Sequence, residues 1–242
     1  MRLYLLHFGT MQPGGIPVCG YLIQADDGTN VLVDTGWPRS YVTDPMHPPG
    51  LTLEIAEEDT AAARLGSIGL TPGDIDLLIC SHLDDDHSGN HDLFTGAELI
   101  VQRKHLELAR SGHPRFARNR DAWDHPDLRY RMIEGDKEIL PGVEVIETSG
   151  HVPGHQSVLI RLAETGPVIL AIDAVMDQSM ADPDEREIWL TDWAETPEDE
   201  AQIRASTRKL AQVASQERAA LTIYGHDARQ WPTLRHAPAF YS

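Results

Sequence analysis

The sequence predicts an α+β fold in which two mixed β-sheets pack face to face and helices cover their outer faces. Short apolar segments bounded by turn residues indicate strands. These strands come in two groups, each followed by a helical segment, and that order favours layered sheets. A length of 242 residues allows one large domain with a substantial core. We therefore expect a single domain spanning residues 1–242.

Nine segments have the apolar character expected of strands. They are residues 3–8, 18–24, 30–34, 75–80, 97–102, 143–148, 158–162, 168–172 and 220–224. Glycine, proline and aspartate gather at 12–15 and 26–28, which predicts turns between the first three strands. Four prolines between residues 37 and 50 indicate an irregular surface loop.

Three segments have helical character. Residues 53–65 predict a helix with a solvated acidic face, and residues 104–110 predict a second helix. A third is expected to begin at residues 195–199, with Thr196 as the N-cap and Pro197 at the first helical position. The apolar stripe of this third helix, which we expect to pack on the core, consists of Ile203, Leu210 and Val213.

The composition restricts the class of protein. Hydrophobic residues make up 41% of the chain and charged residues 24%, as in ordinary soluble domains. No apolar run approaches the roughly 20 residues that cross a bilayer, and residues 1–7 predict a strand rather than a signal peptide. Cys19 and Cys80 stand in apolar contexts, which predicts buried free thiols and suits the reducing cytoplasm. A formal net charge of −18 argues against nucleic-acid binding and favours a neutral small substrate.

Four potential metal ligands follow the predicted strand 75–80. His82, Asp84, Asp86 and His87 lie within six residues, at a strand end where sheet proteins usually place their chemistry. Neighbouring carboxylates repel one another unless water or a cation relieves them. A solvated acidic turn is the alternative interpretation of this stretch. Further polar residues stand at other strand ends, and the main ones are Asp34, His151, Asp173 and His226.

Taken in order, these segments carry a family resemblance. His-x-Asp-x-Asp-His at 82–87 resembles the His-x-His-x-Asp-His signature of the metallo-β-lactamase superfamily. The segments at 31–36, 148–157, 172–174 and 224–227 resemble other motifs of that superfamily. The closing Gly-His-Asp and the general layout most resemble the N-acyl homoserine lactonase family. The resemblance implies a four-layer αββα sandwich, which periodicity alone does not predict.

The resemblance also implies a ligand set for two divalent metal ions. The first site would use His82, Asp84 and His151, and the second Asp86, His87 and His226, with Asp173 as the bridge. Zinc is the first expectation, and manganese, iron or cobalt are alternatives because Asp84 is a hard oxygen donor. Asp34 and Asp227 would orient ligands or the loops that carry them. His155 is expected to be structural, and His91 to lie at the surface or to support a ligand.

The implied reaction is the opening of a lactone ring. A hydroxide made near neutral pH by the metals would attack the lactone carbonyl carbon. Asp86 would hold the second metal and pass a proton to the leaving oxygen. Another ester or thioester hydrolase and a non-catalytic metal-binding protein are the alternatives, and a β-lactam hydrolase is disfavoured. The sequence leaves a homo-oligomer open and does not predict a membrane partner.

Two residues depart from the family pattern. Asp84 stands where the family has histidine, so it either ligates as a harder donor or leaves the first site half-built and the enzyme mononuclear. Met176 stands where the lactonases carry a tyrosine that donates to the substrate carbonyl, and methionine cannot donate. We expect Met176 and Tyr224 near the substrate. Tyr41 and Tyr130 are further candidates for the missing donor.

One segment rich in arginine has two interpretations. Residues 111–132 contain five arginines together with histidines and aromatic residues. This segment is either a lid that faces the substrate or a packed surface excursion.

Overall fold

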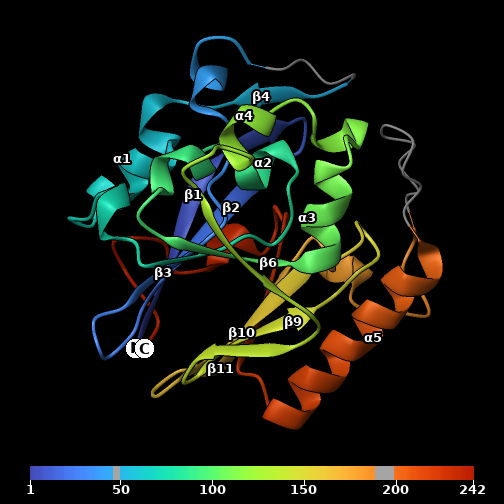
Figure 1. The fold of residues 1–242 in the computed structure, drawn as a ribbon. Coiled ribbons are helices and arrows are strands. Elements are labelled where there is room, and N and C mark those ends of the chain that lie inside the picture. Colours follow the sequence, from blue (N-terminus) through green and yellow to red (C-terminus); the bar gives the residue numbers. More distant parts are fainter. Residues whose placement is uncertain (46–49, 189–198) are drawn as a thin grey trace.

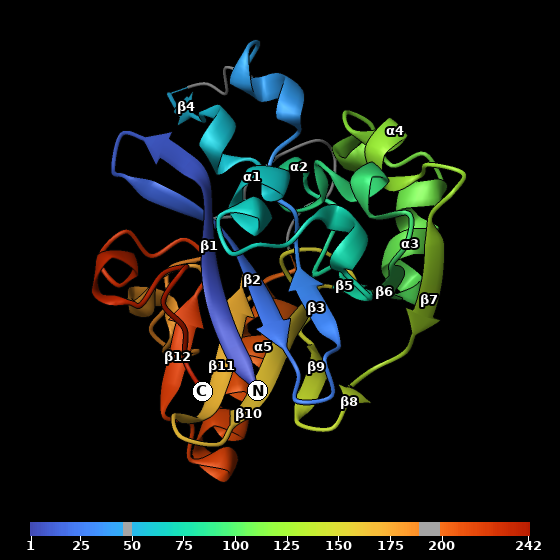
Figure 2. The same ribbon diagram turned by 90° about the vertical axis from the view of Figure 1, so that its left-hand side faces the viewer.

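The computed structural model describes residues 1–45, 50–188 and 199–242. Two sheets lie at the centre, and helices cover their outer faces (Figure 1). The chain ends meet at one end of the sandwich (Figure 2), where Leu3 bridges to Tyr241. This arrangement confirms the predicted fold class. In the described part of the chain, no helix combines the length and the apolar character needed to cross a membrane.

The first sheet has seven strands in the order β4-β1-β2-β3-β5-β6-β7. Their bounds are β1 (Arg2–Gln12), β2 (Ile16–Gln24), β3 (Asn30–Val33), β4 (Thr52–Glu54), β5 (Leu77–Ile79), β6 (Glu98–Gln102) and β7 (Arg129–Ile133). The half from β4 to β3 is antiparallel, and the half from β3 to β7 is parallel. The carboxyl ends of β3, β5 and β6 therefore meet at one edge, where loops can share a site.

The second sheet has five strands in the order β12-β11-β10-β9-β8. Their bounds are β8 (Lys137–Leu140), β9 (Val143–Glu147), β10 (Gln156–Leu162), β11 (Gly166–Ile172) and β12 (Leu221–Tyr224). All neighbours are antiparallel except β11 and β12. Side chains alternate between the two faces of a strand. Val158 and Ile160 of β10 accordingly enter the core between the sheets, and Leu159 faces the outer helix.

Helices cover both sheets. They are α1 (Ala61–Gly66), α2 (Asp85–Ser88), α3 (Arg103–Arg110), α4 (Arg120–Trp123) and α5 (Glu200–Glu217). Leu65 of α1 packs on the first sheet and Leu210 of α5 on the second. Short 3-10 helices are η1 (Arg39–Val42), η2 (Glu57–Asp59), η3 (Pro72–Asp74), η4 (His91–Phe94), η5 (Pro114–Phe116), η6 (Gln178–Met180) and η7 (Trp231–Thr233).

All nine predicted strands are present, and the described residues form three further strands that were not predicted. These are β4, β7 and β8, and each lies at or near a sheet edge. β7 carries Arg129 and Arg131 on an edge, where charged side chains protect the strand from pairing with other chains. Charged edge strands have weak apolar patterns, so the sequence gives little signal for them.

Two helix boundaries differ from the prediction. The helix expected over 53–65 is wrong in its first half, because Leu53 pairs with Met11 in β4. The helix begins at Ala61, after Thr60 Oγ1 accepts a hydrogen bond from the Ala63 N–H at 3.3 Å. The N-cap of α5 is Asp199, not Thr196. Thr196 and Pro197 lie outside the described residues. The predicted stripe of α5 is confirmed, with Ile203 and Leu210 buried and Val213 half-buried.

Both cysteines are buried and free, as expected. Burial raises the pKa of each thiol well above its ordinary value. A thiol in this environment is inert as a nucleophile.

Candidate metal centre

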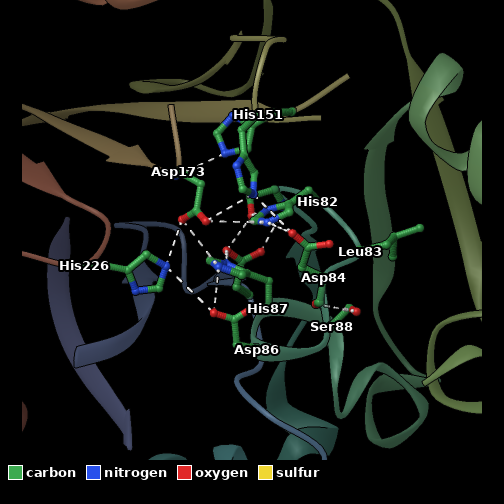
Figure 3. A network of polar contacts seen from close by, with 12 residues as sticks. His82, Leu83, Asp84, Asp86, His87, Ser88, His151, Asp173 and His226 are labelled. Atoms are coloured by element: carbon green, nitrogen blue, oxygen red, sulfur yellow. Dashed lines mark hydrogen bonds and ion pairs between the residues drawn. The ribbon is translucent and has the colours of Figure 1, made fainter. Parts of the chain in front are cut away.

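Seven polar side chains from four strand ends point toward one another (Figure 3). The loop after β5 carries His82, Asp84, Asp86 and His87, and the loops after β9, β11 and β12 carry His151, Asp173 and His226. The imidazole centroids of His82 and His87 are 4.1 Å apart, and those of His82 and His151 are 5.1 Å apart. These strand ends meet because β3 and β5 run parallel in one sheet and β11 and β12 run parallel in the other. The structure thus brings together every residue of the predicted ligand set.

Asp34 holds the loop after β5 from behind. It lies at the end of β3 with φ 59°, and its carboxylate is fully buried. It accepts hydrogen bonds from the Ser81 N–H at 2.8 Å and the Ser81 hydroxyl at 2.6 Å. A third bond comes from His87 Nδ1 at 2.8 Å. Because a carboxylate accepts only, Nδ1 of His87 carries the proton and Nε2 points into the site.

The charges around His87 favour a cation. Burial alone would lower the pKa of His87, but the carboxylates of Asp86, Asp173 and Asp34 raise it well above its ordinary value. His87 Nε2 lies 3.5 Å from both Asp86 and Asp173. Positive charge at this point is therefore stabilised by the surrounding carboxylates.

Asp173 faces both halves of the site. Its Oδ1 lies 3.2 Å from His226 Nε2 and 3.5 Å from His87 Nε2. Its Oδ2 lies 3.4 Å from His151 Nε2 and 3.8 Å from His82 Nε2. Burial acts to raise the pKa of Asp173, and the imidazoles of His226 and His87 hold it well below its ordinary value instead. An ionised carboxylate with one oxygen toward each half has the geometry of a bridge.

Two other histidines fix the orientation of these groups. His226 Nδ1 donates to the Pro17 carbonyl at 2.8 Å, which leaves Nε2 for the site. His155 is buried between Thr148 Oγ1, 2.8 Å from Nδ1, and the backbone N–H of Asp173, which donates to Nε2 at 3.2 Å. His155 therefore supports Asp173 and lies outside the ligand groups, in agreement with its expected structural role.

The residues fit metal ions. The described residues include three groups in which the donor atoms all lie within 4.8 Å of one another. These groups are His82–Asp84–His151, Asp86–His87–His226 and His82–His87–Asp173. His82 Nε2, His87 Nε2 and Asp173 Oδ1 are buried and make no hydrogen bond to any described residue. Buried polar atoms usually have partners, and a cation would satisfy these three at once. Burial lowers the pKa of His82 to about 3, helped by His87 and opposed by Asp84, so its ring is neutral and offers a lone pair.

Arg115 is the site residue that sequence reasoning missed. Its Nε donates to Asp84 Oδ1 at 2.7 Å, and its Nη2 donates to Asp84 Oδ2 at 2.6 Å. Burial acts to raise the pKa of Asp84, and the guanidinium draws it well below its ordinary value. The sequence places five arginines in residues 111–132, and no pattern in it distinguishes Arg115 from the others.

Residues 111–132 form a packed excursion, and one of their side chains reaches the ligand loop. Phe116 and Trp123 are fully buried in a cluster with Leu106 and Val101, so the segment is packed. Arg115 nevertheless extends from it to the ligand loop. The packed aromatic residues fix the backbone from which this side chain reaches the site.

Asp227 lies where it was expected to support a loop, whereas His91 does not lie at the surface. Asp227 accepts hydrogen bonds from the backbone N–H groups of Gln178, Arg229 and Gln230 at 2.9–3.0 Å, so it holds the loop after β12. His91 is fully buried, and neither ring nitrogen bonds to a described residue. Its expected surface position is therefore wrong, because η4 turns the side chain inward.

The four residues expected near the substrate have different surroundings. The Met176 carbonyl accepts the His226 N–H at 2.8 Å, so Met176 is beside the site. Tyr224 packs with the cluster beneath α5, which includes Leu210. The Tyr41 hydroxyl donates to Asp85 at 2.8 Å, and the Tyr130 hydroxyl donates to the Trp123 carbonyl. Tyr130 is therefore occupied within the segment at 111–132.

We expect Asp34→Asn to weaken metal binding by about 10–100-fold, the usual effect of removing a partner that orients a ligand. Asparagine presents one oxygen and one NH2 group, so it cannot accept from the Ser81 N–H on one side and from the Ser81 hydroxyl and His87 Nδ1 on the other. Isothermal titration calorimetry with Zn²⁺ would measure the change. Asp27→Asn, in an exposed turn, is the matched control and should bind as the unaltered protein does. Equal affinities for the two variants would contradict the role assigned to Asp34.

Comparison with known proteins agrees with this fold. The sequence model of the metallo-β-lactamase superfamily matches residues 14–231. The chain therefore belongs to the metallo-β-lactamase superfamily and, within it, to the N-acyl homoserine lactonase family, on the identities that follow. It is 34% identical to an N-acyl homoserine lactonase of a Bacillus species over 230 residues, covering 91% of this chain and 86% of that one. It is 33% identical to the N-acyl homoserine lactonase AiiA of Bacillus thuringiensis subsp. kurstaki, covering 93% of this chain and 87% of that one.

A solved structure gives the same result in three dimensions. A variant of B. thuringiensis AiiA with N-decanoyl-L-homoserine bound at its active site matches with a TM-score of 0.82 and 30% sequence identity. The match covers 99% of this chain and 98% of that chain. The family and the αββα fold expected from the sequence are both confirmed.

Proposed function

We propose that this protein is a metal-dependent hydrolase that opens the lactone ring of N-acyl homoserine lactones and so quenches quorum signals. The observation that carries the proposal is the orientation of Asp173. One of its carboxylate oxygens faces His226 and His87, and the other faces His151 and His82. The homologues named above are N-acyl homoserine lactonases, and their sequences align with most of this chain. The protein would act as a single domain of residues 1–242 in the cytoplasm.

The metal-binding residues would be those that converge. His82, Asp84 and His151 would hold one divalent ion, and Asp86, His87 and His226 a second, with Asp173 shared. Zinc suits these nitrogen and oxygen donors, and manganese, iron or cobalt would suit the harder oxygen of Asp84. When bound, such a metal pair supplies Lewis acidity and a nucleophile at neutral pH.

The protein's own residues orient the reaction. Asp86 Oδ2 lies 3.5 Å from His87 Nε2 and 3.8 Å from His226 Nε2, so it belongs to the second group. Burial raises the pKa of Asp86. Asp86 would also pass a proton to the leaving ring oxygen, as a general acid does. Asp34 and Asp227 would keep the ligand loops in place. Met176 and Tyr224 would contribute to the wall around the substrate.

The charge of the chain fits this substrate class. The formal net charge is −18, and a neutral lactone meets no repulsion from it. A nucleic-acid backbone would be repelled, so we propose no nucleic-acid partner and no membrane partner. The same surface charge is compatible with a homo-oligomer.

Ring opening of a series of N-acyl homoserine lactones should proceed with the metal-loaded protein and stop after treatment with EDTA, because the ligand atoms then lack their cations. A pH-stat assay would measure the acid released, and readdition of Zn²⁺ should restore turnover. Hydrolysis of aryl esters or glutathione thioesters without any lactone turnover would favour the ester or thioester hydrolase instead. Metal binding without turnover of any of these substrates would mark a non-catalytic member.

A further inference from the structure

Arg115 bonds to atoms that belong to one of the two proposed metal sites. Its Nη2 lies 2.6 Å from Asp84 Oδ2 and 2.9 Å from His151 Nε2. The same Oδ2 atom lies 3.1 Å from His151 Nε2 and 3.2 Å from His82 Nε2. The guanidinium therefore shares two of the three donor atoms that would bind a metal at the first site.

These contacts are strong because they are charge-assisted and largely dry. The fork of Arg115 meets both oxygens of Asp84, which is the geometry that gives arginine–carboxylate pairs their strength. The side chain of Arg115 is 9% exposed and that of Asp84 is 16% exposed. The Nη2 atom of Arg115 lies within hydrogen-bond distance of both Asp84 Oδ2 and His151 Nε2, so a metal can bind these two atoms together only when Arg115 moves.

The Nε2 atom of His151 also has hydrogen-bond partners. Nε2 either donates to Asp84 Oδ2 at 3.1 Å or accepts from Arg115 Nη2 at 2.9 Å. In both cases the lone pair that a metal needs is engaged or protonated. Binding of a metal at this nitrogen therefore requires the loss of a hydrogen bond.

Among the described residues, no such competitor lies at the second site. In the described part of the chain, the ion-pair partners of Asp86 are His87 and His226. These are themselves members of the second donor group. A metal at the second site displaces no arginine.

Arg115 also balances the charge of Asp84. The family signature has a neutral histidine where this chain has Asp84. An ionised aspartate paired with a guanidinium has the same net charge as that histidine. The pair thus adds a built-in cation to the first site together with the additional carboxylate.

We propose that Arg115 competes with the metal at the first site, so that the second site fills first and the first fills only when Arg115 releases Asp84 and His151. The inference rests on the proposed metal-dependent function. Arg115 is here a residue that sets the relative affinities of two sites. The protein with one metal equivalent would keep the Arg115–Asp84 pair intact.

Titration of the metal-free protein with Zn²⁺, monitored by isothermal titration calorimetry, tests the proposal. The unaltered protein should bind two equivalents, the second at least about tenfold more weakly, because a charged hydrogen-bond pair must break. In Arg115→Gln the second equivalent should bind about tenfold or more tightly than in the unaltered protein. The first equivalent should change by less than about twofold. Arg120→Gln is the matched control, because Arg120 stands in the same segment and pairs with Asp124 at the surface.

A second variant and a crystal structure provide two further tests of the proposal. Arg115→Lys retains the charge without the fork, so it should fold and give an intermediate affinity for the second equivalent. A crystal structure with one equivalent of Zn²⁺ should show the ion among Asp86, His87 and His226, and Arg115 still on Asp84. An ion at His82, Asp84 and His151 with Arg115 displaced would overturn the proposal, and so would equal affinities in the unaltered protein. Failure of every variant to bind Zn²⁺ would instead reject the metal-dependent function itself.

Discussion

Asp173→Asn is expected to reduce lactonase kcat/KM by at least about 10²–10³-fold, the scale seen when one preorganised electrostatic group is removed from an active site. The amide has one oxygen and one NH2 group, so it cannot present an acceptor to both halves of the site. In the structure, Oδ1 faces His226 and His87, and Oδ2 faces His151 and His82. Metal content per chain, measured by plasma mass spectrometry, should fall together with activity.

Asp177→Asn is the control for that experiment. Asp177 lies four residues further along the chain, and its carboxylate bonds to Ser179 and Arg229. No hydrogen bond or ion pair joins its carboxylate to a described member of the ligand groups. This variant should keep its metal content and most of its activity. A fully active Asp173→Asn protein with two bound metals would show that the carboxylate does not bridge.

Gly89→Ala is expected to destabilise the fold by about 3 kcal/mol or more, at the upper end of overpacking effects. A Cβ at this position would lie 2.1 Å from Pro38 N and 2.3 Å from Trp37 C, and both are backbone atoms that cannot rotate away. Gly89 ends α2, which carries Asp86 and His87, and its N–H donates to the Gly36 carbonyl at 2.9 Å. The added methyl group would therefore push the ligand loop away from the turn after β3. Denaturant unfolding would measure the loss, and activity should fall with it.

Gly96→Ala provides the matched control, because a Cβ there would meet no atom within 4 Å. Its unfolding free energy should stay within about 0.5 kcal/mol of the unaltered protein, as for most surface substitutions. Similar stabilities for the two alanine variants would contradict the close contact between the ligand loop and the turn at Trp37.

The candidate site was predictable where chemistry-bearing residues follow apolar strands. His82, Asp84, Asp86 and His87 stand directly after a buried strand, and parallel strands bring their carboxyl ends to a common edge. The order of the later segments then matched one family. The sequence could not show the arrangement of Asp173, because the orientation of each carboxylate oxygen depends on two sheets meeting.

The missed features have a common cause. Arg115 reaches Asp84 from 31 residues further along the chain, and the packing of Phe116 and Trp123 decides where that backbone lies. The strand β4 forms where helical periodicity was expected, because pairing with Met11 stabilises an extended backbone at Leu53. Local patterns do not contain such partners.

By itself the sequence determined which side chains could bind a cation, which strands deliver them, and the family to which the chain belongs. Those properties depend on residue type and on order along the chain. The tertiary structure alone decided that each oxygen of Asp173 faces a different pair of histidines and that Arg115 shares Asp84 and His151 with one proposed metal site. Such contacts are distances between atoms from separate loops, and packing of the two sheets sets those distances.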